Sequence, residues 1–317
     1  MAETMYTVSS SPHIRDNSSV QSIMRDVIIA LLPATVAGIY FFGWDAVWVI
    51  LTAVISCVAS EWVWCKVTKS SNTTKDLSAV VTGLLLAFNV PPSIKLWMVV
   101  VGSVFTIIIV KALFGGIGQN IVNPALAGRA FLLASYPVAM TTWTNPLDGT
   151  TGATPLAILK GGEAAGQHLP TLTQAFLGQI GGCIGETSAL ALLIGFIYLL
   201  YRRVITWHIP VFYIGTVAVL GAIFGRGDMG AMAGLYEIMV GGVMLGGIFM
   251  ATDYTTSPMT KKGQIIFAIA AGCLAMIIRK FGGYPEGCSY SILIMNLAVP
   301  LIDKYVRPRT FGTGEAK

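Results

Sequence analysis

A short polar loop at residues 148–155 carries the residues best suited to covalent chemistry, in the order Asp-Gly-Thr-Thr-Gly-Ala-Thr-Pro. Its two glycines let the backbone turn and come close to another surface. Pro155 favours an extended conformation at Thr154, which presents the Thr154 hydroxyl. Asp148 could position that acceptor or the metal-bound donor of a transferred group. The loop therefore predicts a hydroxyl that a modifying enzyme can reach.

The same loop has a plainer interpretation and two rival acceptors. Asn-Pro and Asp-Gly pairs are ordinary turn signals in a polar loop. Thr150 and Thr151 carry the same hydroxyl as Thr154. Within the loop alone the three threonines are equivalent, so the choice depends on the rest of the chain.

A second candidate is the glycine-rich stretch 178–188, which ends in Glu186, Thr187 and Ser188 at the opening of an apolar segment. A helix that begins here offers free N–H groups and a positive dipole end, which suit a phosphate or a ring carbonyl. The alternative is that these small residues only cap and pack the helix.

Polar residues inside apolar segments are the third group, because such residues are costly in a membrane and usually functional. Glu61 lies within the apolar segment 46–66, and Asp253 follows another; both are candidates for an ion path. Arg129 could pair with a carboxylate or with a phosphate. For each residue, helix capping is the competing explanation. Further polar residues sit at breaks or ends of apolar segments: Asn89, Asn123, Glu286 and Asn296.

The composition sets the class of protein that holds these residues. Hydrophobic residues make up 55% of the chain and charged residues 11%, with a mean hydropathy of +0.73. Soluble domains carry about 25% charged residues. We therefore expect an all-α polytopic membrane protein.

Ten apolar segments can be recognised, and a full span needs about 20 residues. Segment 77–90 is short and ends in Val-Pro-Pro, which predicts a half-helix held inside protein. The segments are 26–42, 46–66, 77–90, 95–114, 118–135, 178–201, 207–225, 232–251, 264–280 and 287–303.

The placement of positive charge predicts the orientation. With ten spans both termini lie on one side, and fourteen of the twenty Lys and Arg residues then face that side. By the positive-inside rule this side is the cytoplasm, and the loop with Thr154 is extracytoplasmic. The five residues counted on the outer side are Lys95, Lys160, Arg226, Arg279 and Lys280. Nothing in this pattern predicts a nucleic-acid partner.

An internal repeat divides the chain into two halves of five segments each. Residues 82–89 followed by Phe-Gly-Gly at 114–116 correspond to residues 246–253 followed by Phe-Gly-Gly at 281–283. Since five is odd, the halves must be inverted in the membrane, an arrangement that transporters build from broken helices. The predicted parts are a cytoplasmic segment 1–23, a first repeat 24–135, an outer loop 136–177, a second repeat 178–305 and a cytoplasmic tail 306–317.

Cysteine and histidine supply no metal signature. The five cysteines contain no Cys-x-x-Cys pair and the three histidines are scattered, so we expect neither an iron–sulfur cluster nor a zinc site held by this chain. No residue pattern predicts a catalytic group of the chain's own.

Taken in order over residues 20–305, the motifs resemble one family of membrane proteins. The family contains RnfD of the Rnf complexes and its homologue NqrB of the sodium-pumping NADH:quinone oxidoreductase. The motifs that carry the resemblance are residues 148–155, Gly185 to Ser188, Asn-Pro-Ala at 123–125 with Arg129, Ala251 to Tyr254, and 281–287 leading to Asn296. The chain lacks the longer N-terminal extension of the quinone-reducing homologue, which favours the Rnf branch.

The resemblance implies a cofactor. It places FMN on Thr154 through a phosphoester made by a flavin transferase, with Asp148, Gly152 and Ala153 completing the motif. By analogy with the quinone-reducing homologue it also allows a second, non-covalent flavin such as riboflavin. Arg129, Glu186 and Thr187 are the further candidates for flavin contacts.

The resemblance also implies a role within a larger assembly. It predicts a subunit of an ion-translocating ferredoxin:NAD+ oxidoreductase in a bacterial cytoplasmic membrane, not catalytic alone, with Rnf partner subunits A, B, C, E and G. Electrons would pass from ferredoxin to NAD+ as Na+ or H+ crosses the membrane. The alternatives are a subunit of the quinone-reducing enzyme, a non-redox transporter or channel with inverted repeats, and a subunit that only anchors partners.

Overall fold

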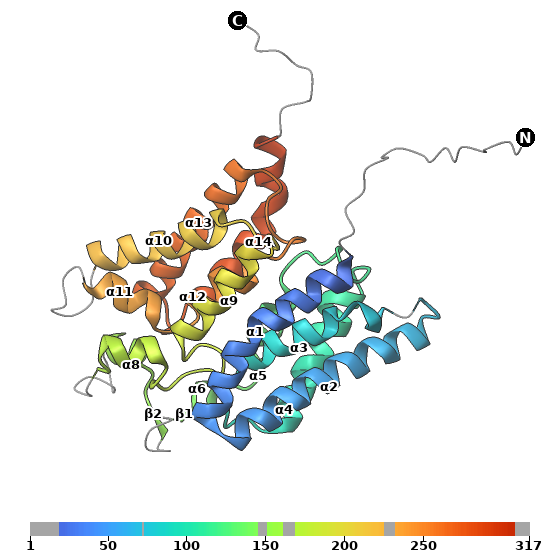
Figure 1. Ribbon diagram of the computed structural model, residues 1–317, viewed down its shortest axis with the longest axis horizontal. Coiled ribbons are helices and arrows are strands. Elements are labelled where there is room, and N and C mark those ends of the chain that lie inside the picture. Colours follow the sequence, from blue (N-terminus) through green and yellow to red (C-terminus); the bar gives the residue numbers. More distant parts are fainter. Residues whose placement is uncertain (1–18, 72, 145–150, 161–168, 225–231, 308–317) are drawn as a thin grey trace, which may run out of the picture.

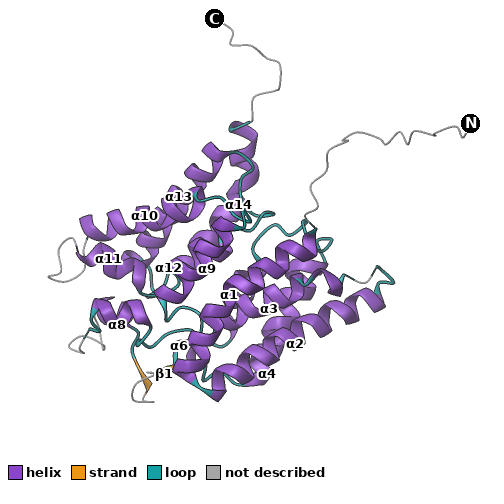
Figure 2. Ribbon diagram, in the orientation of Figure 1, coloured by secondary structure: helices purple, strands orange, loops and turns teal. Residues whose placement is uncertain are grey.

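A computed structural model describes residues 19–71, 73–144, 151–160, 169–224 and 232–307. Helix dominates these residues, and the strands among them form a single two-residue pair (Figure 2). Asp148 and Thr150 of the polar loop lie outside the described residues.

The first half of the chain forms a group of packed helices. In chain order these are α1 (Val20–Phe42), α2 (Trp44–Val67), the 3₁₀ turn η1 (Thr74–Asp76), α3 (Ser78–Phe88), α4 (Leu96–Val104) continued by the π-helical η2 (Phe105–Ala112), and α5 (Pro124–Ser135). Helix α2 packs on α3 and α4, and α5 packs on η2. The helix α5 begins where Asn123 accepts a hydrogen bond from the Leu126 amide and Pro124 occupies the first turn.

A connecting region follows at one end of the helices. It contains α6 (Pro137–Thr141), the antiparallel pair β1 (Trp143–Thr144) and β2 (Thr151–Gly152), α7 (Pro155–Lys160) and α8 (Leu172–Leu177). Figure 1 shows β1, β2 and α8 at the opposite end of the molecule from the start of α1 and the end of α14.

The second half forms a similar group. It consists of α9 (Ala189–Tyr201), α10 (His208–Ile223), α11 (Met232–Met239), α12 (Val243–Leu245) continued by the π-helical η4 (Gly246–Met250), α13 (Lys261–Phe281) and α14 (Cys288–Tyr305). Helix α10 packs on α11 and α13. Helices α11 and α12–η4 meet at a bend of 71°.

The two halves meet along α1 with α9 and along α5 with α14, and Figure 1 shows α1 and α9 side by side. The α1–α9 contact is close because Gly195 faces the backbone carbonyl of Ala30; any side chain there would collide with it. The core between the halves is apolar, and Leu31, Phe88 and Leu192 are fully buried in it. Close packing of such side chains holds helices together in a membrane, where lipid tails are as apolar as the helices themselves.

The helices agree with a polytopic membrane protein. Among the described residues, three helices are long and apolar enough to cross a membrane by length and composition: α1, α2 and α13. The bent pair of α11 with α12–η4 makes a fourth if it counts as one span. Shorter apolar helices occupy residues 78–88, 96–112, 189–201 and 208–223.

Two predicted segments are wrong at their starts. Segments 118–135 and 178–201 contain helix only from Pro124 and from Ala189. Each helix begins just after a side chain that caps it, Asn123 in one case and Ser188 in the other. Before these caps the backbone is irregular, in stretches that mix apolar residues with glycine and polar residues. Mean hydropathy over such a stretch does not report whether it is helical.

Candidate functional site

Thr154 stands at the junction between the β1–β2 pair and α7. Its side chain is half-buried, and its Oγ1 accepts a hydrogen bond from the Ala157 amide at 3.2 Å, so Thr154 caps the N-terminus of α7. Gly152 is exposed and pairs with Trp143, while Ala153 is half-buried. Thr154 is therefore only partly covered by the protein, at the point where the chain leaves β2 and enters α7.

A cavity of about 30 Å³ lies beside Thr154. Arg129, Glu186 and Thr187 line it together with Thr154. The structure thus brings together four of the residues that the sequence singled out, from three separate motifs. A cavity of this size holds only one or two water molecules.

Arg129 and Glu186 form a buried ion pair that joins the two halves. The Arg129 Nη1 atom lies 2.7 Å from Glu186 Oε1 and also donates to Asn89 Oδ1 at 3.0 Å. Arg129 belongs to α5, whereas Glu186 precedes α9. Of the two partners considered for Arg129, the structure supplies the carboxylate. Both side chains are buried, so removing either one leaves an uncompensated charge in the protein interior.

The irregular segment before α9 is held against the end of α3. The amides of Ile184 and Gly185 donate to the carbonyls of Val90 and Phe88, at 3.3 and 3.1 Å. These bonds satisfy backbone groups that neither helix can pair by itself. They also fix Glu186 opposite Arg129.

A second buried cluster surrounds Arg279. Its Nη1 lies 2.9 Å from Glu237 Oε2, and its Nη2 lies 3.1 Å from Glu286 Oε1. The side chain of Arg279 is fully buried. Counting Arg279 as an outer-loop charge is therefore wrong: it looks like one because it precedes Lys280 at a helix end, but Glu237 and Glu286 draw it inward.

The two clusters meet at Gly242. Glu286 Oε2 accepts the Gly242 amide at 2.9 Å, and a Cβ atom at Gly242 would lie 2.7 Å from Glu186 Oε1. Gly242 stands at the bend before α12, where the absence of a side chain leaves room for the Glu186 carboxylate; the neighbouring Gly241 leaves room for Glu286 in the same way. This junction was missed in the sequence, where its one signal is a set of acidic residues near apolar segments that each require a partner.

Glu61 has a different partner from any of these. The Lys111 Nζ lies 2.9 Å from Glu61 Oε1 and 2.7 Å from Ser78 Oγ, and Thr73 Oγ1 donates to the same Oε1 at 3.1 Å. Glu61 and Lys111 are both buried. The buried carboxylate of Glu61 therefore holds the Lys111 ammonium group in the interior of the protein.

Asp253 lines a second and much larger cavity, of about 320 Å³, on the side of the molecule where α1 begins. Asn120 Nδ2 and Thr256 Oγ1 donate to Asp253 Oδ2 at 3.3 and 3.2 Å. Asp253 lies in the segment after η4, and burial raises the pKa of its carboxyl, against these hydrogen bonds that lower it.

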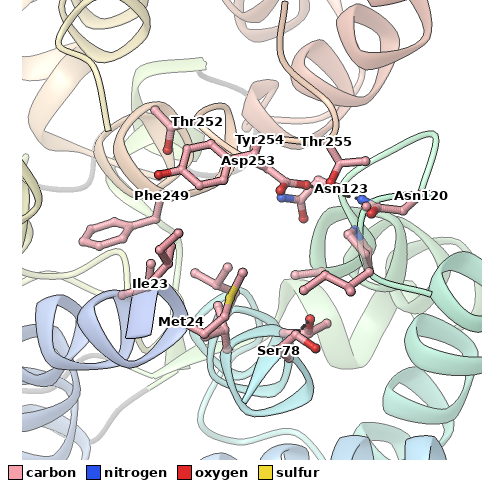
Figure 3. Close-up of a pocket in the computed structure, with 18 of the residues that line it drawn as sticks. Ile23, Met24, Ser78, Asn120, Asn123, Phe249, Thr252, Asp253, Tyr254 and Thr255 are labelled. Carbon is pink, nitrogen blue, oxygen red and sulfur yellow. Dashed lines mark hydrogen bonds between the residues drawn. The ribbon is translucent and has the colours of Figure 1, made fainter. Parts of the chain in front are cut away.

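The large cavity lies between the two halves. In Figure 3, Ile23 and Met24 of α1, Ser78 of α3 and Phe249 of η4 surround one space, with Asp253 on its rim. Lys111 also lines this cavity, whereas Glu61 does not. Most of the wall is apolar, and its polar residues include Asp253, Asn120, Asn123, Ser78 and Lys111.

Asparagine side chains at the breaks of the helices make contacts between the two halves. Asn89 Oδ1 accepts from Arg129, and its Nδ2 faces the Met250 sulfur. Asn123 donates to the Met250 carbonyl at 3.2 Å. With its amide turned so that the oxygen faces donors, Asn296 accepts from the Asn123 amide at 2.9 Å. Asn123 and Asn296 therefore meet between the halves, while Asn89 bonds to Arg129 of the small cavity and Asp253 lines the large one.

The chain is similar throughout its length to known membrane proteins. Residues 7–312 match the profile of the NQR2, RnfD, RnfE family. The chain is 54% identical to the D subunit of the "Na(+)-translocating ferredoxin:NAD(+) oxidoreductase complex" of Acetobacterium woodii, covering 100% of this chain and 98% of the relative.

Two further relatives show how far the likeness extends. The D subunit of the "Proton-translocating ferredoxin:NAD(+) oxidoreductase complex" of Clostridium ljungdahlii is 48% identical, with 98% of this chain and 97% of the relative covered. The D subunit of the "Ion-translocating oxidoreductase complex" of Escherichia coli is 36% identical, with 97% and 99% covered.

Proposed function

The chain belongs to the NQR2, RnfD, RnfE family, and from this premise we propose that it is the membrane subunit of an ion-translocating ferredoxin:NAD+ oxidoreductase and carries FMN esterified to Thr154. The observation that carries the proposal is the position of Thr154, at the protein surface and beside the buried Arg129–Glu186 pair. Bound flavin supplies electron transfer in steps of one or two electrons.

The residues around Thr154 fit a tethered flavin in a particular way. The adjoining cavity of about 30 Å³ is too small for a flavin ring system, so Thr154 would hold the group through its phosphate and this cavity would not hold the ring. Gly152 and Ala153 leave room beside the acceptor because neither carries a large side chain. Asp148 completes the acceptor motif from outside the described residues. Glu186 is paired with Arg129. This ion pair forms the floor of the site and does not bind the phosphate.

The larger cavity supports a second, non-covalent flavin. Its volume of about 320 Å³ falls in the range of ligand sites, about 300–1,000 Å³. Apolar walls from Met24, Leu85 and Phe249 suit the faces of a flat ring system. The amides of Asn120 and Asn123 suit its polar edge.

We further propose that the ten apolar segments form two inverted five-helix repeats. The packing supports it: α2 contacts α3 and α4 as α10 contacts α11 and α13, and the joints α1–α9 and α5–α14 each pair equivalent helices. In this arrangement both termini are cytoplasmic and Thr154 is extracytoplasmic. Exposed apolar side chains such as Val36 and Ile55 then face lipid.

The cation and its path are part of the same proposal. Two relatives of similar identity are named for different ions, one for Na+ and one for protons, so overall similarity does not choose between them. Glu61 and Asp253 remain the candidates for the path, since each is a carboxylate inside the helical body.

The partners are the Rnf subunits A, B, C, E and G, with electrons passing from ferredoxin to NAD+.

In-gel fluorescence tests the covalent flavin. The chain is produced together with its flavin transferase, denatured, separated and viewed under ultraviolet light. We expect a fluorescent band for the wild type and for Thr151→Val, and a dark band for Thr154→Val. A dark wild-type band, or fluorescence that survives Thr154→Val, contradicts the proposal.

A further inference from the structure

Lys111 lies between a buried carboxylate and the large cavity. Its Nζ is bonded to Glu61 Oε1 and to Ser78 Oγ. Both Lys111 and Ser78 line the cavity, and Glu61 stands behind them. The Lys111 ammonium group can therefore interact either with Glu61 or with a group bound in the cavity.

Only one oxygen of the Glu61 carboxylate has hydrogen-bond partners among the described residues. Lys111 and Thr73 both bind Oε1, while Oε2 is buried without a hydrogen-bond partner in the described part of the chain. A buried carboxylate that loses its only cation becomes an uncompensated charge, which is strongly unfavourable. Glu61 then needs another positive partner in the same place.

The side chain of Lys111 is suited to exchanging one hydrogen-bond acceptor for another. A lysine ammonium is a compact charge on a flexible four-carbon stem, with three donors that can turn toward new acceptors. Lys111 lies in the π-helical segment η2, and such segments occur often at functional sites. Its bond to Ser78 already directs one donor to the wall of the cavity.

We propose that Lys111 is a mobile counter-ion: negative charge that develops in the large cavity draws its ammonium group from Glu61, and Glu61 then takes up one monovalent cation, H+ or Na+. The inference rests on the proposed second flavin as the group that becomes negative. One electron, supplied by the ferredoxin-linked donor of the complex, is balanced by one cation taken up at Glu61. The exchange breaks the hydrogen bond from Lys111 to Glu61 but no covalent bond; only when the cation is a proton does a covalent bond form, at the Glu61 carboxylate.

The surroundings of Glu61 contain few other groups that could take over this role. Its own helix α2 contributes the thiols of Cys57 and Cys65. Thr73 and Ser78 contribute hydroxyl groups, and η2 contributes Lys111. Among the described residues that contact Glu61, Lys111 is the cation, so its departure decides the charge of the site.

The test is a redox titration of the non-covalent flavin in the purified complex, as Na+ and pH are varied in turn. For the wild type we expect the potential to fall when the coupled cation is diluted, by up to ~59 mV per tenfold for one cation per electron. A response to Na+ at fixed pH identifies sodium, and a response to pH at fixed Na+ that Glu61→Gln removes identifies a proton.

Variants separate partner exchange from a simple field effect. In Glu61→Gln and in Lys111→Met the flavin potential should no longer depend on the cation concentration. Glu61→Gln has no carboxylate to take up the cation. In Lys111→Met, Glu61 holds a cation in both redox states. Lys111→Arg should retain the dependence. Lys66→Met removes an exposed positive charge from the same helix as Glu61 and should titrate like the wild type.

Folding is controlled by the double variant Glu61→Gln/Lys111→Met, which removes both charges together and should also lack the response. A wild type that releases no flavin on denaturation overturns the proposed second flavin, and this inference with it. A wild type with bound flavin whose response persists in Glu61→Gln overturns the counter-ion role alone.

Discussion

The two cavities differ in how their charges are satisfied. Beside Thr154, Arg129 pairs with Glu186, and Arg279 pairs with Glu237 and Glu286. In the large cavity Asp253 is held by neutral donors, from Asn120 and Thr256. Full pairing fixes a structure, whereas a carboxylate without a cation can respond to a change of charge nearby. The charges at the end with Thr154 are therefore paired with each other, whereas at the large cavity Lys111 is paired with Glu61 and Asp253 is held by neutral groups.

The largest loss of stability should come from a change at Arg279, in the buried cluster near Thr154. Arg279→Met leaves Glu237 and Glu286 buried without their guanidinium group, which costs about 3–5 kcal/mol. We expect a large fall in the thermal unfolding midpoint of the purified protein. Arg279→Lys should recover only part of the loss, because an ammonium cannot bridge both carboxylates in the same way. An unfolding midpoint unchanged in Arg279→Met would show that this cluster is not structural.

A smaller loss of stability should follow from a change at Gly242, where the two clusters meet. Gly242→Ala places a Cβ atom 2.7 Å from Glu186 Oε1 and forces the pairs apart, at a cost of about 1–3 kcal/mol. Gly215→Ala is the matched control, since nothing lies within 4 Å of its Cβ. The control should be neutral or stabilising by up to about 1 kcal/mol, because alanine favours helix. Equal unfolding midpoints in the two variants would contradict the close junction.

Asp253 should respond to pH in the opposite way to a paired carboxylate. Burial raises the pKa of Asp253 in the folded protein, so its contribution to stability is present below the unfolded pKa and is lost as the pH rises through the folded pKa. Asp253→Asn removes that dependence. We expect the variant to be as stable as the wild type at low pH and slightly more stable at neutral pH, measured by thermal unfolding across the pH range. A variant that is less stable at neutral pH would mean that a cation already compensates Asp253.

The smallest effect should come from a pair outside both cavities. Arg202 Nη2 lies 3.1 Å from Asp26 Oδ2 between α9 and α1, but the Arg202 side chain is 46% exposed. Water screens such a pair, so Arg202→Gln should shift the unfolding midpoint least of these variants. A shift as large as that of Arg279→Met would contradict the ranking by burial.

The general fold could be predicted from the sequence for clear physical reasons. Ten apolar segments each contain helix because a membrane requires its backbone groups to be paired internally. The starts at Pro124 and Ala189 were misplaced, because the chain stays irregular there before a capping residue.

For the site, residues were easier to predict than their partners. Thr154, Arg129, Glu186 and Thr187 were singled out from separate motifs, and they line one cavity. The pairing of Glu61 with Lys111 could not be foreseen, because it joins helices whose rotation about their axes a hydropathy pattern does not fix. The buried position of Arg279 was missed for the same reason.

The most direct test of the account is the intact mass of the chain produced with its flavin transferase, followed by mapping of the modified peptide. We predict an added mass of one FMN less water, located on Thr154. An unmodified mass, or a flavin located on Thr150 or Thr151, would contradict the central claim.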